Sequence, residues 1–376
     1  MCGSRPRNLA HLKKIGIFEI DHYEMGYALI KVLLKDYEIF FFTTEILQER
    51  LSKKVDKGVN WVIKKENSTL IDFYKCMASE VKKNKINALL INTIEDNFSE
   101  LASELKDLES KNILTLHNVN FWFNHSNWFL SDSYKKNKHK IALKKEIDAY
   151  CVLSDNVKNY LTETYNPKKP VFVFPYSIFE PQRSNELSEV SFAIPGSIDV
   201  SRRDYELILK CFEDLHNENL KFSLFLLGAP SYEYGKSIIE KAKVLKAKGV
   251  AIEFFEKLVD QDVFDNLISK SSFILSPLQP VIREEQYGKS KETGCFFDMI
   301  RYSKPGIVPE YVPAPPQMRS SVMCYSNKES LMDLLRKIIA DEKMRNDYTG
   351  RAQKNSELFS VENVRIETTK FIETLI

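Results

Sequence analysis

The chain has 376 residues, of which 43% are hydrophobic and 12% aromatic, enough for about two domains with sizeable cores. These values exclude a disordered tail and a small disulfide-stapled domain. Lysine and arginine total 54 against 52 aspartate and glutamate, which gives a net charge of +2. So small an excess supplies no general positive field, and we expect no nucleic-acid partner.

The six cysteines are scattered and form no C-x-x-C pair, which argues against a zinc site or a disulfide framework. No window approaches the ~18 uncharged apolar residues that a membrane-spanning helix needs, and the N-terminus lacks an apolar stretch of signal-peptide length. We therefore expect a cytoplasmic protein in a reducing compartment.

Apolar runs alternate with helical patterns through the first half of the chain. Because these runs show no inside/outside alternation, they predict parallel strands covered by helices on both faces. The expected strands are 15–20, 38–43, 86–91, 113–116, 149–154 and 171–174, and the clearest helices are 23–34 and 98–110.

Residues 179–190 are polar and read as a linker, after which the alternation resumes. Expected strands are 192–195, 222–227, 250–255, 273–276 and 307–308, and expected helices are 205–216, 237–248, 263–270, 295–302, 329–341 and 344–358. We therefore predict an α/β protein with two Rossmann-like domains, 1–180 and 181–376, facing across a cleft. The last helix is a candidate to pack back on the first domain.

Several familiar site motifs are missing from the sequence. Neither half has G-x-G-x-x-G after its first strand, and there is no G-x-x-x-x-G-K-[ST], so dinucleotide and P-loop sites lack their phosphate cradle. There is also no G-x-S-x-G elbow for a serine hydrolase.

The most informative stretch is Pro277–Glu310, which follows an expected buried strand and enters a helix near Thr293–Gly294. Its glycines allow backbone N–H groups to approach a ligand, and the helix N-terminus favours a phosphate. Lys289 and Lys291 add positive charge, and a carboxylate can accept hydrogen bonds from sugar hydroxyls. This combination suits a nucleotide diphosphate-sugar.

The same stretch resembles the GT-B superfamily of glycosyltransferases, in particular the retaining group with E-G-F-G-x-x-x-x-E-A before a helix. Glu285-Gln286-Tyr287-Gly288 stands at E-G-F-G, and residues 304–308 (KPGIV) resemble the segment after the helix. The second glutamate of the motif falls on Thr293, with Glu292 one residue before it. Which of these two meets the ribose stays open.

The resemblance implies a C-terminal domain that binds the donor and an N-terminal domain that binds the acceptor. His117, at the end of an expected strand, would face the donor sugar, and a core histidine is the alternative. The implied catalytic residues are His117, Asp21 and Glu285, and the implied donor-binding residues are Gly196, Arg202, Arg203, Tyr287, Gly288, Lys289, Lys291, Glu292, Thr293 and Gly294.

We expect a metal-independent transferase that moves a sugar from a nucleotide-sugar to a glycan, glycolipid or other acceptor, without a cofactor. The partial E-x7-E likeness favours retention of configuration. If the enzyme inverts instead, Asp21, His22 or Glu24 is the nearest base. Two alternatives stay open: a nucleotide-sugar 2-epimerase, and a catalytically silent GT-B subunit that stabilises a partner transferase.

Two other clusters have competing interpretations. Asp260-Gln261-Asp262 matches a D-x-D metal motif but directly precedes an expected helix, so we interpret Asp260 as its N-cap. The basic run Lys135–Lys145 follows an aromatic stretch that contains Trp122, Trp128 and Phe129. Such a neighbourhood suits peripheral contact with an anionic bilayer or a polyprenyl phosphate, and a solvated helix face is the alternative.

Overall fold

The computed structural model describes residues 12–124, 131–181 and 189–376, with the backbone alone for 131–135. The chain divides into two compact units. Unit 1 consists of Met1–Leu153, Leu161–Tyr176 and Val361–Ile376, and unit 2 consists of Ser154–Tyr160 and Ser177–Ser360. Trp128 and Phe129 lie outside the described residues, as does the side chain of Lys135.

Unit 1 contains a seven-stranded parallel sheet in the order β3-β2-β1-β4-β5-β6-β7. The expectation of parallel strands is confirmed, and the central strands are buried on both faces because helices cover them. The strands are β1 (Lys14–Phe18), β2 (Glu38–Thr43), β3 (Val59–Ile63), β4 (Ala88–Ile91), β5 (Lys111–Thr115), β6 (Ala149–Val152) and β7 (Val171–Val173).

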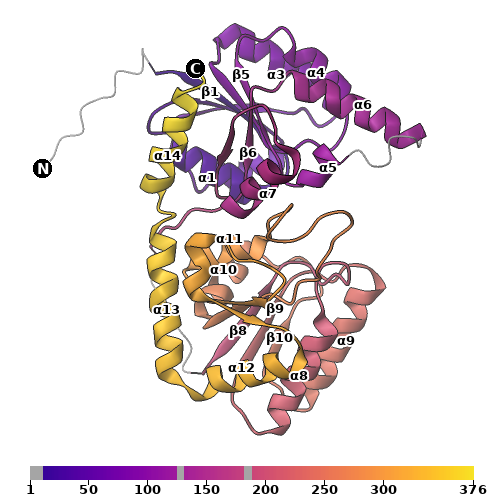
Figure 1. Ribbon diagram of the computed structural model, residues 1–376, viewed down its shortest axis with the longest axis vertical. Coiled ribbons are helices and arrows are strands. Elements are labelled where there is room, and N and C mark those ends of the chain that lie inside the picture. The colour runs from indigo at the N-terminus through magenta and orange to yellow at the C-terminus, as the bar shows by residue number, and fades with distance from the viewer. Residues whose placement is uncertain (1–11, 125–130, 182–188) are drawn as a thin grey trace, which may run out of the picture. The chain divides into compact units, whose positions relative to one another are not determined.

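Helices of unit 1 form two groups. The first group is α1 (Tyr23–Leu33), α2 (Glu45–Ser52) and α14 (Val361–Glu373), in which α1 contacts both others (Figure 1). In the second group, α4 (Phe98–Leu105) contacts both α3 (Leu70–Asn84) and α6 (Ser131–Lys145). Unit 1 also contains α5 (Val119–Phe123). Helix α7 (Asp155–Tyr165) is divided, with residues 155–160 in unit 2 and residues 161–165 in unit 1.

Several elements of unit 1 escape the sequence analysis, among them α2, β3 and α3. β3 is one of the two edge strands of this sheet and is only partly buried, so its sequence lacks a continuous apolar run. α3 begins with a capping box, in which the Thr69 side chain accepts from the backbone N–H of Asp72 and the Asp72 carboxylate accepts from that of Thr69. This signal is local and independent of hydrophobic spacing.

Unit 2 contains a six-stranded parallel sheet in the order β10-β9-β8-β11-β12-β13. Five of its strands match the sequence expectation, and β13 is additional. The strands are β8 (Ser191–Pro195), β9 (Ser223–Leu227), β10 (Ile252–Phe254), β11 (Phe273–Leu275), β12 (Gly306–Pro309) and β13 (Val322–Tyr325).

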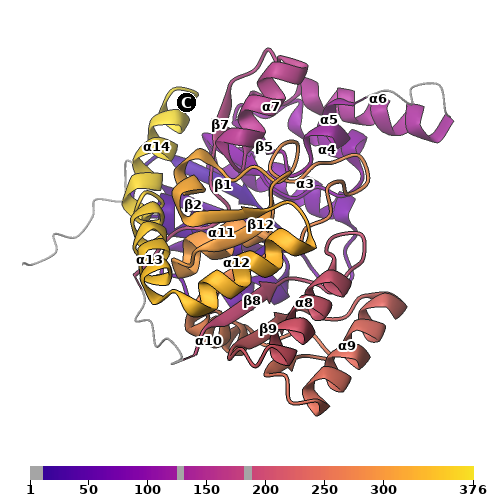
Figure 2. The ribbon, with the colours of Figure 1, turned by 60° about the horizontal axis from the view of Figure 1, so that its bottom comes forward.

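Helix α8 contacts α9 and α12, and these three helices share one apolar core with the strands. Helix α11 contacts the sheet through β8 and β11 and lies beside α13 (Figures 1 and 2). The helices of unit 2 are α8 (Tyr205–Asn217), α9 (Tyr232–Ala247), α10 (Gln261–Lys270), α11 (Gly294–Tyr302), α12 (Lys328–Ala340) and α13 (Glu342–Glu357), with a 3-10 helix over Pro316–Ser321.

Both sheets reverse their strand order at one position. In unit 1 the chain winds outward in opposite directions from β1 and β4, and in unit 2 from β8 and β11. Ligands of such sheets bind beyond the carboxyl ends of the strands at this switch point. The fold therefore directs attention to the loops after β1 and β4, and to those after β8 and β11.

Helix α14 is the C-terminal element of the chain and is part of unit 1. The Phe371 ring stacks on Phe172 with centroids 4.2 Å apart, and Arg365 donates to the Asp36 carboxylate. Ile372 is fully buried, whereas Ile366 on the same helix is 49% exposed. α14 therefore completes the hydrophobic core of unit 1.

We predict that Ile372→Ala lowers the free energy of unfolding of unit 1 by about 2–4 kcal/mol, because it opens a cavity in a packed site. Ile366→Ala is the matched control and should change that free energy by less than about 0.5 kcal/mol. Trp61 and Trp122 belong to unit 1, so their fluorescence during urea denaturation reports on this unit. Equal effects of the two substitutions would contradict the packing of α14.

Candidate functional site

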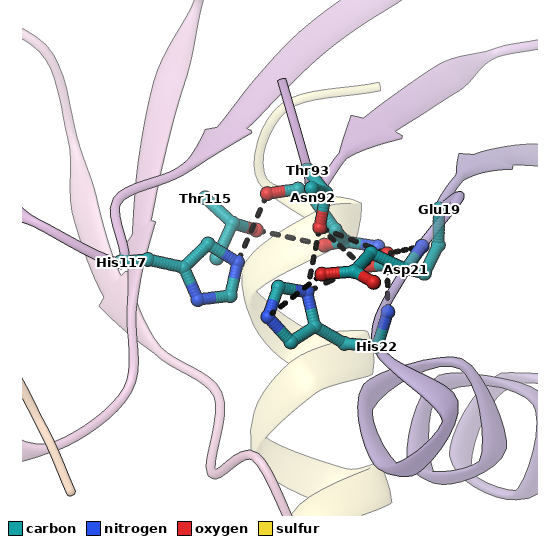
Figure 3. Close-up of polar contacts among 7 residues, drawn as sticks. All are labelled: Glu19, Asp21, His22, Asn92, Thr93, Thr115 and His117. Atoms are coloured by element: carbon teal, nitrogen blue, oxygen red, sulfur yellow. Dashed lines mark hydrogen bonds and ion pairs between the residues drawn. The ribbon is translucent and has the colours of Figure 1, made fainter. Parts of the chain in front are cut away.

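Glu19 is the first residue after β1, and its side chain is fully buried at the switch point of unit 1 (Figure 3). Its Oε1 atom accepts hydrogen bonds from the backbone N–H groups of Asp21 at 2.8 Å and His22 at 2.9 Å. Burial raises the pKa of this carboxyl, but hydrogen bonds and the charge of His22 outweigh it, so the net pKa is lowered. Glu19 is therefore held as a carboxylate.

His22 lies directly before α1 and is joined to Glu19 through Thr93, which follows β4. The Thr93 Oγ1 atom lies 2.8 Å from His22 Nδ1 and 2.8 Å from Glu19 Oε1. Burial lowers the pKa of His22, but the hydrogen bond and charge of Glu19 raise it above its ordinary value. The sequence analysis includes His22 only as an alternative base, and it misses Glu19 and Thr93.

His117 follows β5, as expected, and its ring stacks on that of His22 with centroids 4.7 Å apart and an interplanar angle of 17° (Figure 3). Its Nε2 lies 3.0 Å from the carbonyl oxygen of Asn92, so Nε2 carries a proton. The Asn92 side chain accepts from the Thr115 hydroxyl at 2.7 Å. Tyr176 meets both histidine rings edge-on.

The structure thus brings two predicted residues of unit 1 together at one switch point, namely Asp21 and His117. The Asp21 side chain is exposed, and its Oδ2 lies 3.8 Å from His22 Nε2. The polar residues that link them, Glu19, Asn92 and Thr93, each stand just after an apolar strand. A polar residue directly after an apolar run is the sequence signal that would have identified them.

In unit 2 the loop between β8 and α8 contains Arg203, which is 7% exposed. Its Nη1 donates to the Ser197 carbonyl at 3.3 Å, and its Nη2 lies 3.5 Å from the Cys295 sulfur in the first turn of α11. Among the residues that the structure describes, the Nε atom of Arg203 has no hydrogen-bond partner. No carboxylate in these described ranges forms an ion pair with its guanidinium. Within the described ranges, Arg203 is therefore a buried cation without a counter-charge.

Gly196, directly after β8, makes room for this guanidinium. A Cβ at Gly196 would lie 2.6 Å from Arg203 Nη2, and its φ of +90° also favours glycine. Arg202, in contrast, is exposed and lies 3.6 Å from Asp199. The two neighbouring arginines of the prediction thus occupy different environments.

The loop before α11 is held by its own backbone. Glu285 is 4% exposed and exchanges two backbone hydrogen bonds with Ile282, and Gly288 has a φ of +72° with its N–H bonded to the Lys291 carbonyl at 2.8 Å. A Cβ at Gly288 would lie 2.6 Å from the Pro313 oxygen. Tyr287 is buried, and Lys289 is exposed.

Lys291 belongs to the same loop and lies within the influence of three charged neighbours. Burial and then the charge of Arg202 lower the pKa of Lys291 to about 8, assisted by Arg283 and opposed by Glu285. The loop is therefore rich in cations, with Glu285 as the buried acid among them.

Helix α11 begins at Gly294, as the sequence predicts. Thr293 caps it, since its Oγ1 accepts a hydrogen bond from the Cys295 N–H at 3.4 Å. No atom lies within 4 Å of the place that a Gly294 Cβ would take. Glu292 is buried, and its Oε1 accepts from the Thr293 N–H at 2.9 Å. Burial raises the pKa of Glu292 to about 7, against the effect of Ser154 beside it.

Two further expectations concern clusters outside these loops. Asp260 is confirmed as an N-cap, since it accepts from the Asp262 N–H at 3.0 Å at the start of α10.

In the basic run, Lys140 donates to the Phe121 carbonyl at 2.6 Å and Lys144 to the Trp122 carbonyl at 2.9 Å. These lysines satisfy the end of α5 and lie over the Phe121 and Phe123 rings, so they stabilise unit 1 internally.

Among the described residues, no helix combines the length and hydropathy required to cross a membrane. No protein-family model matches this sequence, and no curated protein matches it either.

Solved structures do resemble the chain. A glycosyltransferase from Rickettsia africae ESF-5 has a TM-score of 0.70 and 15% identity, over 97% of this chain and 98% of that one. Anabaena HepE, solved with UDP and glucose, has a TM-score of 0.69 and 10% identity, over 96% and 100%. A UDP-N-acetylglucosamine 2-epimerase has a TM-score of 0.60 and 12% identity, over 97% of each chain. At these identities the likeness establishes the fold: two parallel-sheet α/β domains of the GT-B type.

Proposed function

We propose that this protein is a glycosyltransferase in which unit 2 binds a nucleotide-sugar and unit 1 binds the sugar acceptor. The observation that carries the proposal is the buried guanidinium of Arg203 at the switch point of unit 2. A buried charge without a counter-ion is unfavourable, and a bound anion removes that penalty. The adjacent N-terminus of α11 favours an anion at the same place.

A diphosphate is the anion that fits these groups. Arg203 and the open backbone at Gly294 supply donors for its oxygens, and Lys291 supplies further positive charge. The HepE structure was solved with UDP and glucose, so we take UDP as the leaving group to test first. These groups would stabilise the charge that develops on the departing diphosphate, which supports transfer that is independent of a metal.

Two buried acidic residues of unit 2 are candidates to bind the uncharged hydroxyl groups of the donor. Glu285 and Glu292 flank the cationic loop, and carboxylates accept hydrogen bonds from sugar and ribose hydroxyls. We propose Glu285 for the sugar, and Glu292 or Thr293 for the ribose. Retention of configuration, with the leaving phosphate taking the acceptor proton, is part of the proposal, and His117 would face the donor sugar.

Arg203→Met tests the diphosphate site, because methionine fills the space without the charge. We predict that it weakens UDP binding ~10- to 150-fold in calorimetry, the value of a lost charged hydrogen bond of about 1.5–3 kcal/mol. The ligand-free variant should be at least as stable as the parent, since it no longer buries an unpaired cation.

Arg336→Met is the matched control in unit 2, because Arg336 lies on the surface, paired with Glu218 and Asp333. It should leave UDP binding unchanged. If Arg203→Met binds UDP like the parent and only loses stability, Arg203 has a structural role and the proposed donor site is incorrect.

Glu292→Gln should change the pH dependence of stability. The folded-state pKa of Glu292, about 7, lies above the ordinary value of 4.5, so the folded chain retains a proton that the unfolded chain releases. Parent stability then falls between about pH 4.5 and 7 by about 3 kcal/mol from this group. Scanning calorimetry from pH 5 to 8 should show that the stability of Glu292→Gln rises relative to that of the parent as the pH increases. Parallel curves would contradict this assignment.

The two rival functions have their own signatures. A 2-epimerase shares this fold, and it would convert UDP-N-acetylglucosamine without an acceptor. A silent subunit would bind no nucleotide diphosphate. We predict UDP binding, no epimerised sugar without acceptor, and transfer once a hydroxyl acceptor is supplied. Proton NMR of the anomeric position of the product then distinguishes retention from inversion.

A further inference from the structure

A chain of hydrogen bonds leads from a buried carboxylate to a partly exposed imidazole in unit 1. Glu19 is fully buried, and Oε1 receives two backbone N–H groups, which fixes this carboxylate as an acceptor. The Thr93 hydroxyl lies 2.8 Å from Oε1 and 3.0 Å from Oε2. Because a carboxylate only accepts, the single hydroxyl proton of Thr93 is donated to Glu19.

The direction of that hydrogen bond determines the tautomer of His22. Because Thr93 donates its only hydroxyl proton to Glu19, Thr93 Oγ1 can only accept a hydrogen bond from His22 Nδ1, 2.8 Å away. The Nδ1 atom therefore carries a proton, and the titrating atom of the ring is Nε2. The side chain of His22 is one-third exposed, whereas the side chain of Glu19 is fully buried.

Charged groups around His22 are mainly acidic. Glu19, Asp21 and Glu24 act on it electrostatically, and His117 and Tyr176 contact its ring. Among the described residues, no lysine or arginine forms an ion pair with these three carboxylates. A phosphate or carboxylate would therefore be repelled here, while a neutral hydroxyl would not.

Asn92 supplies an independent sign that a ligand belongs at this place. It is 2% exposed, its Oδ1 accepts from Thr115, and its Nδ2 has no partner among the described residues. A buried amide donor is unfavourable until an acceptor oxygen reaches it. Figure 3 shows Asn92 beside Thr93 in the same cluster.

We propose that Glu19 and Thr93 are positioning residues that hold a proton on His22 Nδ1, so that Nε2 accepts a hydrogen bond from a hydroxyl of an uncharged acceptor, other than the hydroxyl that attacks the donor. The part that concerns the acceptor rests on the proposed transferase function. The part that concerns the imidazole does not, and it is measurable in the ligand-free protein.

Thr93→Val removes the hydroxyl at nearly constant volume, and Thr93→Ser retains it as the matched control. Nitrogen NMR of the imidazoles reports tautomer and pKa, and His22→Gln assigns the signal among the six histidines. We expect the Nδ1–H tautomer in the parent and in Thr93→Ser. In Thr93→Val the Nε2–H tautomer should gain population and the pKa should fall.

Glu19→Gln is the second variant, and it should lower the pKa of His22 by about one unit or more, because an opposite charge is lost within hydrogen-bonding distance of the relay. If it does not fold, Thr93→Val still decides the question. An Nε2–H tautomer in the parent, or identical spectra for the valine and serine variants, would overturn the proposal.

Steady-state kinetics test the acceptor. Thr93→Val should raise the KM for a neutral acceptor ~10-fold and leave UDP affinity unchanged, and Thr93→Ser should restore the parent KM. If the parent transfers no sugar at all, the proposed function fails while the NMR result stands. If transfer occurs and Thr93→Val shows the parent KM, the function stands and the acceptor role of His22 fails.

Discussion

A parallel sheet covered on both faces leaves only the ends of its strands for polar chemistry. β4 and β6 are buried along their whole length, so a charged side chain within them would have no partner. Polar groups collect instead in the loops at the carboxyl ends, and the reversal of strand order opens a crevice there. Glu19 lies in the loop after β1 and Arg203 in the loop after β8, and each of these strands is the first of its unit.

The charged groups near the two switch points differ in sign. Around His22 they are carboxylates, whereas in unit 2 Lys291 lies near Arg202 and Arg283, with Glu285 as the acid among them. An anionic ligand would therefore be favoured in unit 2 and a neutral one in unit 1. This difference in charge agrees with the proposal that unit 2 binds the donor and unit 1 the acceptor.

The fold is readable from the sequence because buried parallel strands produce continuous apolar runs. β3 and α14 are two of the elements that the sequence pattern misses: β3 is a partly exposed edge, and the pattern of α14 is weakened by exposed residues such as Ile366. The start of α11 is also predictable, since Thr293-Gly294 is a cap signal. The relay of Glu19, Thr93 and His22 is not, because it joins residues more than 70 positions apart through strand pairing. The roles of the site residues stay predictions.

Buried charge ties the proposed function to stability. Arg203, which has no carboxylate partner in the described part of the chain, and Glu292, whose pKa is raised, both make unit 2 less stable than a neutral core would be. A fold accepts such groups when rigid surroundings hold them, and here the surroundings are Gly196 against the guanidinium and the cap of α11 against the carboxyl. Because these groups are already desolvated and oriented, the diphosphate of the proposed donor would meet groups that need little reorganisation. In the proposed function, the unfavourable burial of these groups is thus the physical source of donor affinity.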